Sequence, residues 1–168
     1  MRNKVLLIGL IAGATLFGAA VADEAKEQAA VAKQLPNAKV TLSQGLGASE
    51  AQGRPISAKF EIDEEQFQLT VYIAQGSAFQ EVLFDYTTGK IAKTEPLDEA
   101  EEVAAAKKQI AAMAKAKTTL KAATDKALQE NPGYRALSVT PMLTANHAAA
   151  KVTLVKGAQF KSVSESLE

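Results

Sequence analysis

The sequence predicts an α+β fold made of two repeated units, each with helices packed on one face of a small antiparallel sheet. Ala-rich stretches with a helical period precede stretches in which apolar and polar residues alternate, which is the pattern of half-buried strands. A phrase of the form Val-x-Ile/Leu-x-x-Gly-x-x-Phe-x-x-Val occurs at residues 71–82 and again at residues 152–163, 81 positions later. A repeat of this spacing within 168 residues indicates two similar structural units.

The first unit is expected to begin with two helices and to continue as a meander of strands. Residues 23–35 are Ala-rich and are followed by the helix breaker Pro36. Residues 41–52 predict a second helix, which Gly45 and Gly47 weaken by about 1 kcal/mol each relative to Ala. The predicted strands are residues 56–62, 67–73 and 79–86, with a short fourth strand at residues 90–93.

The second unit repeats this order of elements. Helix is expected from residue 98 to residue 117 and from residue 118 to residue 129, either as two helices or as one, until Pro132 and Gly133 stop it. The expected strands are residues 134–143, 148–155 and 159–167.

Upstream of the repeated phrase, Thr41-Leu42 corresponds to Thr119-Leu120 at an offset of 78. Offsets of 78 and then 81 fit a duplication with a few inserted residues, and chance similarity between alternating strands is the alternative. The apolar positions predict a core for each unit. The expected buried side chains are Phe60, Ile62, Leu69, Val71, Ile73 and Phe79, covered by Leu42 and Leu46, and in the second unit Leu120, Val139, Val152, Leu154 and Phe160.

Residues 1–22 have the features of a cleaved signal peptide. Arg2 and Lys4 precede an apolar run, and Ala20-Val21-Ala22 supplies the small residues that precede a cleavage site. The mature chain is therefore expected to begin near Asp23 and to be periplasmic or secreted, with no membrane insertion after cleavage. A retained membrane anchor is the alternative; it is disfavoured because the run is short, rich in Gly and Ala, and not followed by a basic cluster.

The charge balance argues against a polyanionic partner. The chain has 19 basic and 19 acidic residues, and removal of Arg2 and Lys4 with the signal peptide leaves 17 basic residues against 19 acidic ones. Nucleic acids and anionic membranes both attract proteins with a clear basic excess, so neither is expected as a partner.

No catalytic, cofactor-binding or metal-binding residues are predicted. The sequence has no Cys and a single histidine, His147, in a predicted loop, so the usual zinc ligand sets are missing. The densest acidic cluster, Asp98 to Glu102, lies where a helix is expected to begin and complements the positive end of its dipole. It lacks the alternating oxygen ligands of a calcium loop.

The first unit has a short Ala/Gly-rich helix, then two alternating segments, and it closes with Asp85-Tyr86-Thr87-Thr88-Gly89-Lys90-Ile91. With these features residues 41–93 resemble a PepSY domain, since the last motif is similar to the closing Asp-x-x-Thr-Gly-x-Ile/Val hairpin of that family. Residues 118–168 resemble a second, diverged copy that lacks this hairpin. We therefore divide the chain into a signal peptide (1–22), a first PepSY-like unit with its N-terminal helix (23–97), and a helical linker with a second unit (98–168).

The resemblance implies an exported, non-catalytic binding protein. PepSY domains occur in the pro-segments of secreted metallopeptidases, and their proposed role is to bind and restrain peptidases, so the expected partner is another envelope protein such as a peptidase. Two alternatives stay open. The chain is a carrier for a small apolar ligand held between helix and sheet, or it is an enzyme whose carboxylate pair the sequence spacing does not reveal.

Two segments are candidates for contact with a partner. The first is the hairpin with Asp85, Tyr86, Thr88 and Gly89, which acts either as a structural staple, with Asp bonding nearby backbone N–H groups, or as a tip that touches a partner.

The second candidate is the last predicted strand, with Phe160, Lys161, Val163 and Glu165. It lacks the closing strand that residues 90–93 give to its counterpart, and we therefore expect it to be an open sheet edge. Either its polar side chains keep that edge unpaired, or the edge pairs with a partner or with a second copy of the chain as a homodimer.

Overall fold

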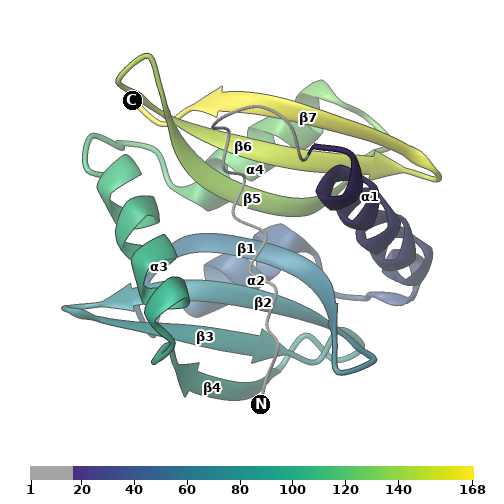
Figure 1. Cartoon of the computed structure of the whole chain (residues 1–168), viewed down its shortest axis with the longest axis horizontal. Helices are drawn as coiled ribbons and strands as arrows, with labels where there is room; N and C mark the ends of the chain where they lie inside the picture. Colours follow the sequence, from purple (N-terminus) through teal and green to yellow (C-terminus); the bar gives the residue numbers. More distant parts are fainter. Residues whose placement is uncertain (1–16) are drawn as a thin grey trace.

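One antiparallel sheet of seven strands organises the structure, which is a computed structural model describing the backbone of residues 17–168 and the side chains from residue 25 onward (Figure 1). The strand order is β4-β3-β2-β1-β5-β6-β7. The strands are β1 (Arg54–Asp63), β2 (Gln66–Gln75), β3 (Ala78–Phe84), β4 (Ile91–Pro96), β5 (Arg135–Thr144), β6 (His147–Lys156) and β7 (Gln159–Ser166).

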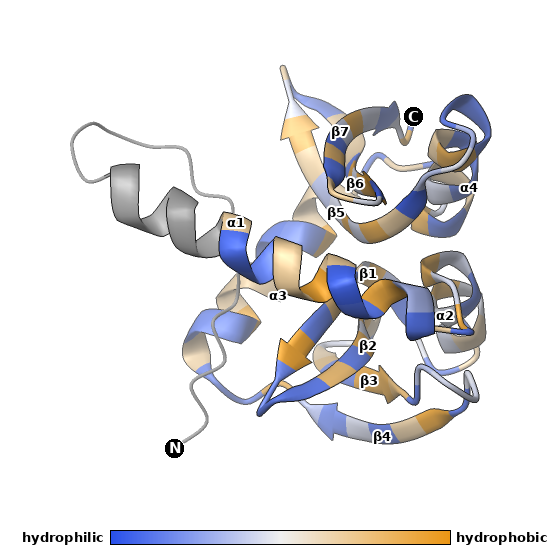
Figure 2. Ribbon diagram, turned by 90° about the vertical axis from the view of Figure 1, so that its right-hand side faces the viewer, coloured by the Kyte–Doolittle hydropathy of each residue, from blue (hydrophilic) through white to orange (hydrophobic). Residues whose placement is uncertain are grey.

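Helices cover both faces of this sheet. Figure 2 shows α2 (Leu42–Ser49) and α4 (Leu120–Glu130) on one side of the strands and α3 (Ala100–Ala112) on the other. α1 (Phe17–Gln34) packs against β1 and leads through the 3₁₀ helix η1 (Leu35–Asn37) into α2. Because α1 begins at Phe17, it crosses the predicted cleavage point before Asp23, whereas most of the predicted signal peptide lies outside the described residues.

The α+β class is confirmed, but the expectation of a separate small sheet for each unit is wrong. β1 and β5, the first strands of the two predicted units, pair with each other through Ala58 opposite Val139 and Lys59 opposite Ser138. An unpaired first strand would leave a row of backbone N–H and C=O groups without partners. By pairing, β1 and β5 provide hydrogen-bond partners for each other's backbone groups, and the two meanders become one sheet.

Structural features recur along the chain at the spacing of the repeated phrase. The register shifts between Pro55 and Ser57 in β1 and between Ala136 and Ser138 in β5, and left-handed glycines occur at Gly76 (φ 62°) and Gly157 (φ 59°). Ala58 pairs with Val139, its own counterpart 81 residues later. We infer that an approximate two-fold axis passes between β1 and β5; the duplication itself stays a prediction.

Both helices on the shared face begin at a threonine cap. The Thr41 side chain accepts a hydrogen bond from the Gln44 backbone N–H, and the Gln44 side-chain oxygen accepts one from the Thr41 N–H, which is a capping box. The Thr119 side chain accepts from the Ala122 N–H at the start of α4. Satisfying these otherwise unpaired donors fixes where each helix starts, which explains why Thr41-Leu42 and Thr119-Leu120 correspond in sequence.

Gly45 has a packing role that the sequence did not reveal. A Cβ at Gly45 would lie 2.6 Å from Leu69 Cδ2, so α2 approaches β2 more closely than any larger residue allows. Leu42 and Leu46 on the same helix are buried, as are Leu69 and Val71 beneath it. The low helix propensity of glycine is offset here by closer helix–sheet contact.

The predicted core is confirmed except at two positions. Ile62 is half-buried, and Phe160 is 39% exposed, which corrects its assignment as a core residue. Its counterpart Phe79 is buried because the segment after β4 returns past it, where the Leu97 N–H donates to the Phe79 carbonyl oxygen at 2.9 Å. Among the described residues no segment returns past β7 in this way, and Phe160 is left in contact with water.

Two arginines join the halves reciprocally. Arg54, the first residue of β1, donates to the Met113 carbonyl oxygen beyond the end of α3 at 3.1 Å. Arg135, the first residue of β5, donates to the carbonyl oxygens of Leu35 and Ala38 after α1. Each arginine therefore fixes the segment at the end of the helix that precedes the other half.

We expect Phe79→Ala to lower the free energy of unfolding by about 3–5 kcal/mol, because it empties a buried aromatic site. Phe160→Ala should lower it by less than about 1.5 kcal/mol, because this ring already meets water. Urea denaturation of the two variants measures the difference. Equal losses in the two variants would show that the uncovered position of Phe160 is wrong.

We also expect Arg135→Lys to lower the free energy of unfolding by about 1–3 kcal/mol, because a lysine cannot reproduce the planar, divergent donors of the guanidinium. Arg54→Lys is the matched comparison; it loses one contact at a more exposed site and should cost less than about 1 kcal/mol. Thermal melts of both variants provide the measurement, and a larger loss for Arg54→Lys would contradict the proposed ranking.

Candidate functional site

The sole histidine lies on the surface near the C-terminus. His147 Nδ1 is 3.0 Å from Glu168 Oε2, and the histidine side chain is 73% exposed. Within residues 17–168, no group of three or more His, Cys, Asp or Glu side chains has the geometry to hold a metal ion. This surface pair therefore offers no buried acid–base arrangement, and the candidate sites lie elsewhere.

A polar network lies on the face of β1–β3 that is opposite to α2. The Thr70 hydroxyl donates to the Glu61 carboxylate at 2.5 Å, and Lys59 Nζ lies 2.6 Å from the same carboxylate and 5.8 Å from the centre of the Tyr72 ring. Burial raises the pKa of Tyr72 well above its usual value, and the nearby carboxylates, Glu61 first, raise that pKa further. The Tyr72 phenol therefore stays neutral.

This network is the surface on which α3 packs. Ser57 Oγ donates to Gln109 Oε1 of α3 at 2.9 Å, and Glu81 of β3 and Glu102 of α3 are 2% and 4% exposed. The alternation in β1 predicts a water-facing polar side, and the sequence analysis did not identify this network. Thr70 and Tyr72 in β2 were the sequence feature that could have indicated this network. Their side chains have both apolar and polar parts, and such side chains suit a sheet face that is polar but covered by a helix.

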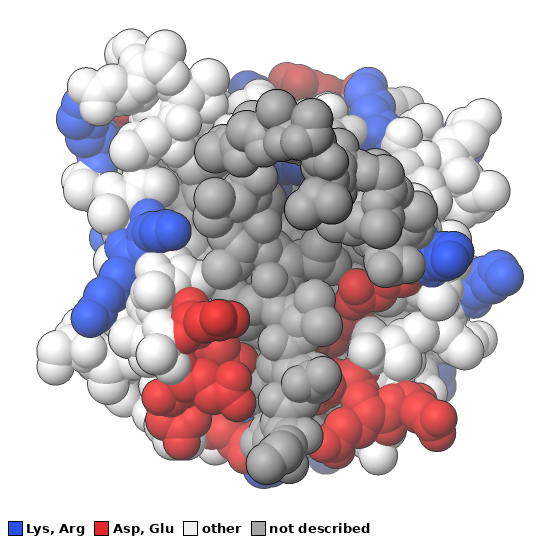
Figure 3. Space-filling view, in the orientation of Figure 1, with Lys and Arg blue, Asp and Glu red and all other residues white. Residues whose placement is uncertain are grey.

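Acidic side chains also gather around this face. In Figure 3 they lie mainly in the lower half of the molecule, over β1–β4 and α3. An acidic surface of this kind repels polyanions and favours basic groups on a partner.

The predicted hairpin is a tightly bonded turn. One oxygen of Asp85, Oδ1, accepts hydrogen bonds from the Thr87 N–H at 2.8 Å, the Thr87 hydroxyl at 2.6 Å and the Thr88 N–H at 2.9 Å. The Gly89 N–H donates to the Asp85 carbonyl oxygen at 2.8 Å, and Gly89 adopts a φ of 71°. These bonds hold the pKa of Asp85 at about 2, with the Thr87 hydroxyl as the largest cause.

Tyr86 anchors this turn to the body of the protein. Its carbonyl oxygen accepts hydrogen bonds from the backbone N–H groups of Lys39 and Val40 at 2.9 and 3.3 Å. Its ring meets Phe67 edge-on at a centroid distance of 5.0 Å, and Phe67 stacks on Phe60 at 5.6 Å. The hydrogen bonds expected of a structural staple are therefore present, and Tyr86 belongs to the anchor rather than to the exposed tip. Contact of the tip with a partner stays a prediction.

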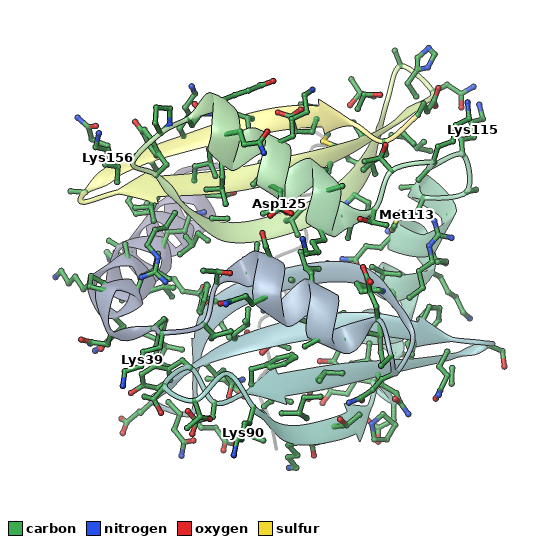
Figure 4. The ribbon with its side chains drawn as sticks, turned by 180° about the vertical axis from the view of Figure 1, so that it is seen from behind. Lys39, Lys90, Met113, Lys115, Asp125 and Lys156 are labelled. Carbon is green, nitrogen blue, oxygen red and sulfur yellow. The ribbon has the colours of Figure 1, made fainter. Side chains whose placement is uncertain are left out.

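The exposed part of the hairpin is a small rigid surface. Asp85, Thr87, Thr88 and Lys90 are exposed, and Gly89 is half-buried against Val40. Figure 4 shows Lys39 and Lys90 at the same corner of the molecule. The turn therefore presents polar side chains on a backbone that its own hydrogen bonds have already fixed.

The second predicted segment is the last strand in the sheet order. Lys161 Nζ lies 2.5 Å from Asn131 Oδ1, and Lys126 Nζ of α4 lies 2.7 Å from Glu165 Oε2. Phe160 is exposed and Val163 is half-buried. The hairpin lies between β3 and β4, so the structure places the two candidate segments toward opposite ends of the sheet and does not bring them together.

A surface pocket of about 370 Å³ lies between the start of β1 and the connection from α3 to α4. Its lining combines polar and apolar side chains: Glu50, Arg54, Lys117, Thr118, Pro55, Met113, Ala116 and Leu120. The Arg54 guanidinium is already bound to the Met113 carbonyl, and the pocket combines a polar rim with a largely apolar lining.

Known proteins give little guidance. No protein family and no curated protein matches the sequence. Among solved structures, one described as a "putative lipoprotein" of Clostridium difficile 630 is similar over 78% of this chain and 88% of its own chain, with 19% sequence identity and a TM-score of 0.42. Such a distant likeness carries no inference about function. In the described part of the chain, no helix combines the length and the apolar character needed to cross a membrane.

We expect the hairpin to make stability depend on pH in the acid range. Folding lowers the pKa of Asp85 from 3.8 to about 2, so its contribution is fully present above the unfolded value and is lost as the pH falls through the folded value. The melting-temperature difference between the wild type and Asp85→Asn should be constant from pH 7 to about pH 5 and should shrink toward pH 2. A difference that is unchanged at pH 2 would contradict this role of the carboxylate.

Proposed function

We propose that this protein is an exported, non-catalytic binding protein that contacts another protein of the cell envelope through the Asp85–Gly89 hairpin. The observation that carries the proposal is the rigidity of that turn, where one carboxylate oxygen accepts three hydrogen bonds and Gly89 holds a left-handed conformation. A surface that is ordered before binding loses less conformational entropy on association. Export rests on the signal-like residues 1–22.

A peptidase is the partner class that we propose. The support is the resemblance of residues 41–93 to PepSY domains, whose proposed role is to restrain peptidases. The hairpin is also the part of the chain that is most similar to that family's motif. A rigid, hydrogen-bonded turn suits this role, because a restraining protein has to hold one conformation against an enzyme surface.

The packing argues against an apolar ligand held between α2 and the sheet. Leu46 of α2 and Leu69 and Val71 of β2 are fully buried, and even a methyl group at Gly45 would overlap Leu69. The interface between α2 and the sheet is therefore filled by the protein's own side chains. Binding of an apolar ligand there would require the helix to move away from the sheet.

Gly89→Ala tests the hairpin, and Gly76→Ala is the matched control. Both positions have a left-handed φ, of 71° and 62°, and an added Cβ meets no atom closer than 3.6 Å at either one. We expect each change to cost about 1–2 kcal/mol of folding stability through the same backbone strain. Only the change at Gly89 alters the shape of the proposed contact.

The measurement is inhibition of chelator-sensitive peptidase activity purified from the exported fraction, with casein as substrate and the mature chain as inhibitor. We expect inhibition by the wild type and by Gly76→Ala at similar concentrations, and at least about tenfold weaker inhibition by Gly89→Ala, a change of about 1.4 kcal/mol in binding. No inhibition by the wild type would remove the peptidase proposal. Equal inhibition by the two variants would remove the hairpin as the contact.

A further inference from the structure

The two edges of the sheet are protected differently. β4 is six residues long and ends at Pro96, which has no N–H to offer an incoming strand. β7 is eight residues long and contains no proline, and it is the outermost strand at the upper side of Figure 1. Proline, short length and free charges are the features that usually keep a sheet edge from pairing, and β7 lacks the first two.

The charges of β7 are already held on the side of α4. Glu165 is 5% exposed and binds Lys126, and Lys161 binds Asn131. The serines at positions 162, 164 and 166 are exposed and uncharged. An approaching strand would therefore meet a polar edge whose charges have fixed positions and carry no net charge.

The order of the side chains along β7 is self-complementary. Lys161-Ser162-Val163-Ser164-Glu165 has its opposite charges at equal distances from Val163. When two copies of this strand run antiparallel and Val163 faces Val163, Lys161 of each copy lies opposite Glu165 of the other. Cross-strand pairs of opposite charge stabilise a sheet, and like charges in the same positions destabilise it.

Backbone geometry favours the same register. In a strand at the edge, the N–H and C=O groups of every second residue point outward. In an antiparallel pair, two residues that lie opposite each other both point their backbone groups toward the partner strand or both away from it. For two identical strands related by a two-fold axis, this is possible only if one residue lies opposite its own copy, because a register shifted by one position would set outward groups against inward ones. An axis at Ser162 or Ser164 places Lys161 or Glu165 opposite an apolar residue. An axis at Val163 pairs both charges.

We propose that β7 is the interface of a homodimer, in which the β7 strands of two copies pair antiparallel about Val163 and join the two sheets into one. Lys161 keeps donors for this contact, since an ammonium group has three and Asn131 takes one. The interface goes beyond the proposed function. Because the Asp85–Gly89 hairpin lies toward the other end of the sheet, it stays accessible in the dimer.

Charge exchange tests this register. We expect the wild-type mature chain to be a dimer in sedimentation analysis. Lys161→Glu alone and Glu165→Lys alone should each weaken the dimer by at least about tenfold, because each creates two like-charge contacts across the axis. An equal mixture of the two variants should dimerise again, since each charge then meets its opposite. Lys93→Glu on β4 is the matched edge control and should behave as the wild type does.

Folding is followed separately by circular dichroism, because Glu165→Lys also loses the contact with Lys126. Recovery in the mixture cannot come from a misfolded chain, so it supports the register. A wild type that is monomeric at high concentration would overturn the proposal, and so would a dimer that both single changes leave intact.

A cross-link gives a second measurement. The chain contains no cysteine, so Val163→Cys introduces the only thiol, and in the proposed dimer the two copies of this thiol face each other across the axis. We expect oxidation to convert this variant to a covalent dimer much faster than Lys93→Cys. Equal rates for the two variants would place the interface elsewhere and would contradict the proposal.

Discussion

The pairing of β1 with β5 is the constraint on which the rest of the structure depends. It consists of two residue pairs, Ala58 with Val139 and Lys59 with Ser138, yet it turns two small meanders into one seven-stranded sheet. A meander of three or four strands with one helix is a small unit, and small units bury a smaller fraction of their surface on folding. Once β1 and β5 pair, α2 and α4 become neighbours, and Arg54 and Arg135 can each reach the helix that precedes the other half.

The two faces of the sheet follow different physical rules. Under α2 and α4 the core is apolar and closely packed, to the extent that Gly45 is required for contact. Under α3 the contact surface is polar: Thr70 donates a hydrogen bond to Glu61, and Lys59 lies close to both the Glu61 carboxylate and the Tyr72 ring. A polar surface has directional contacts and therefore fixes the position of α3 more narrowly than its small alanines can.

The hairpin and the β7 edge are two different kinds of proposed contact surface, one made of side chains and one made of backbone groups. The Asp85–Gly89 turn is closed, since its own backbone and the Asp85 carboxylate satisfy its donors. Recognition there relies on exposed side chains held in place. At β7 no other strand of the described residues 17–168 lies beyond the outer edge, and in the proposed dimer recognition relies on backbone hydrogen bonding and register. The two proposed contacts therefore lie toward opposite ends of the sheet and do not overlap.

The sequence by itself determined the local elements and their order. The alternation of apolar residues identified the strands, Thr41 and Thr119 marked the helix starts, and the Asp85–Gly89 motif indicated its turn, because each depends on interactions within a few residues. Only the tertiary structure decided which strands meet, which face of β1 is covered, and that Phe160 is exposed although Phe79 is buried. Those outcomes depend on contacts between residues that are tens of positions apart. A local sequence pattern does not show whether a distant segment will fold back over a given side chain.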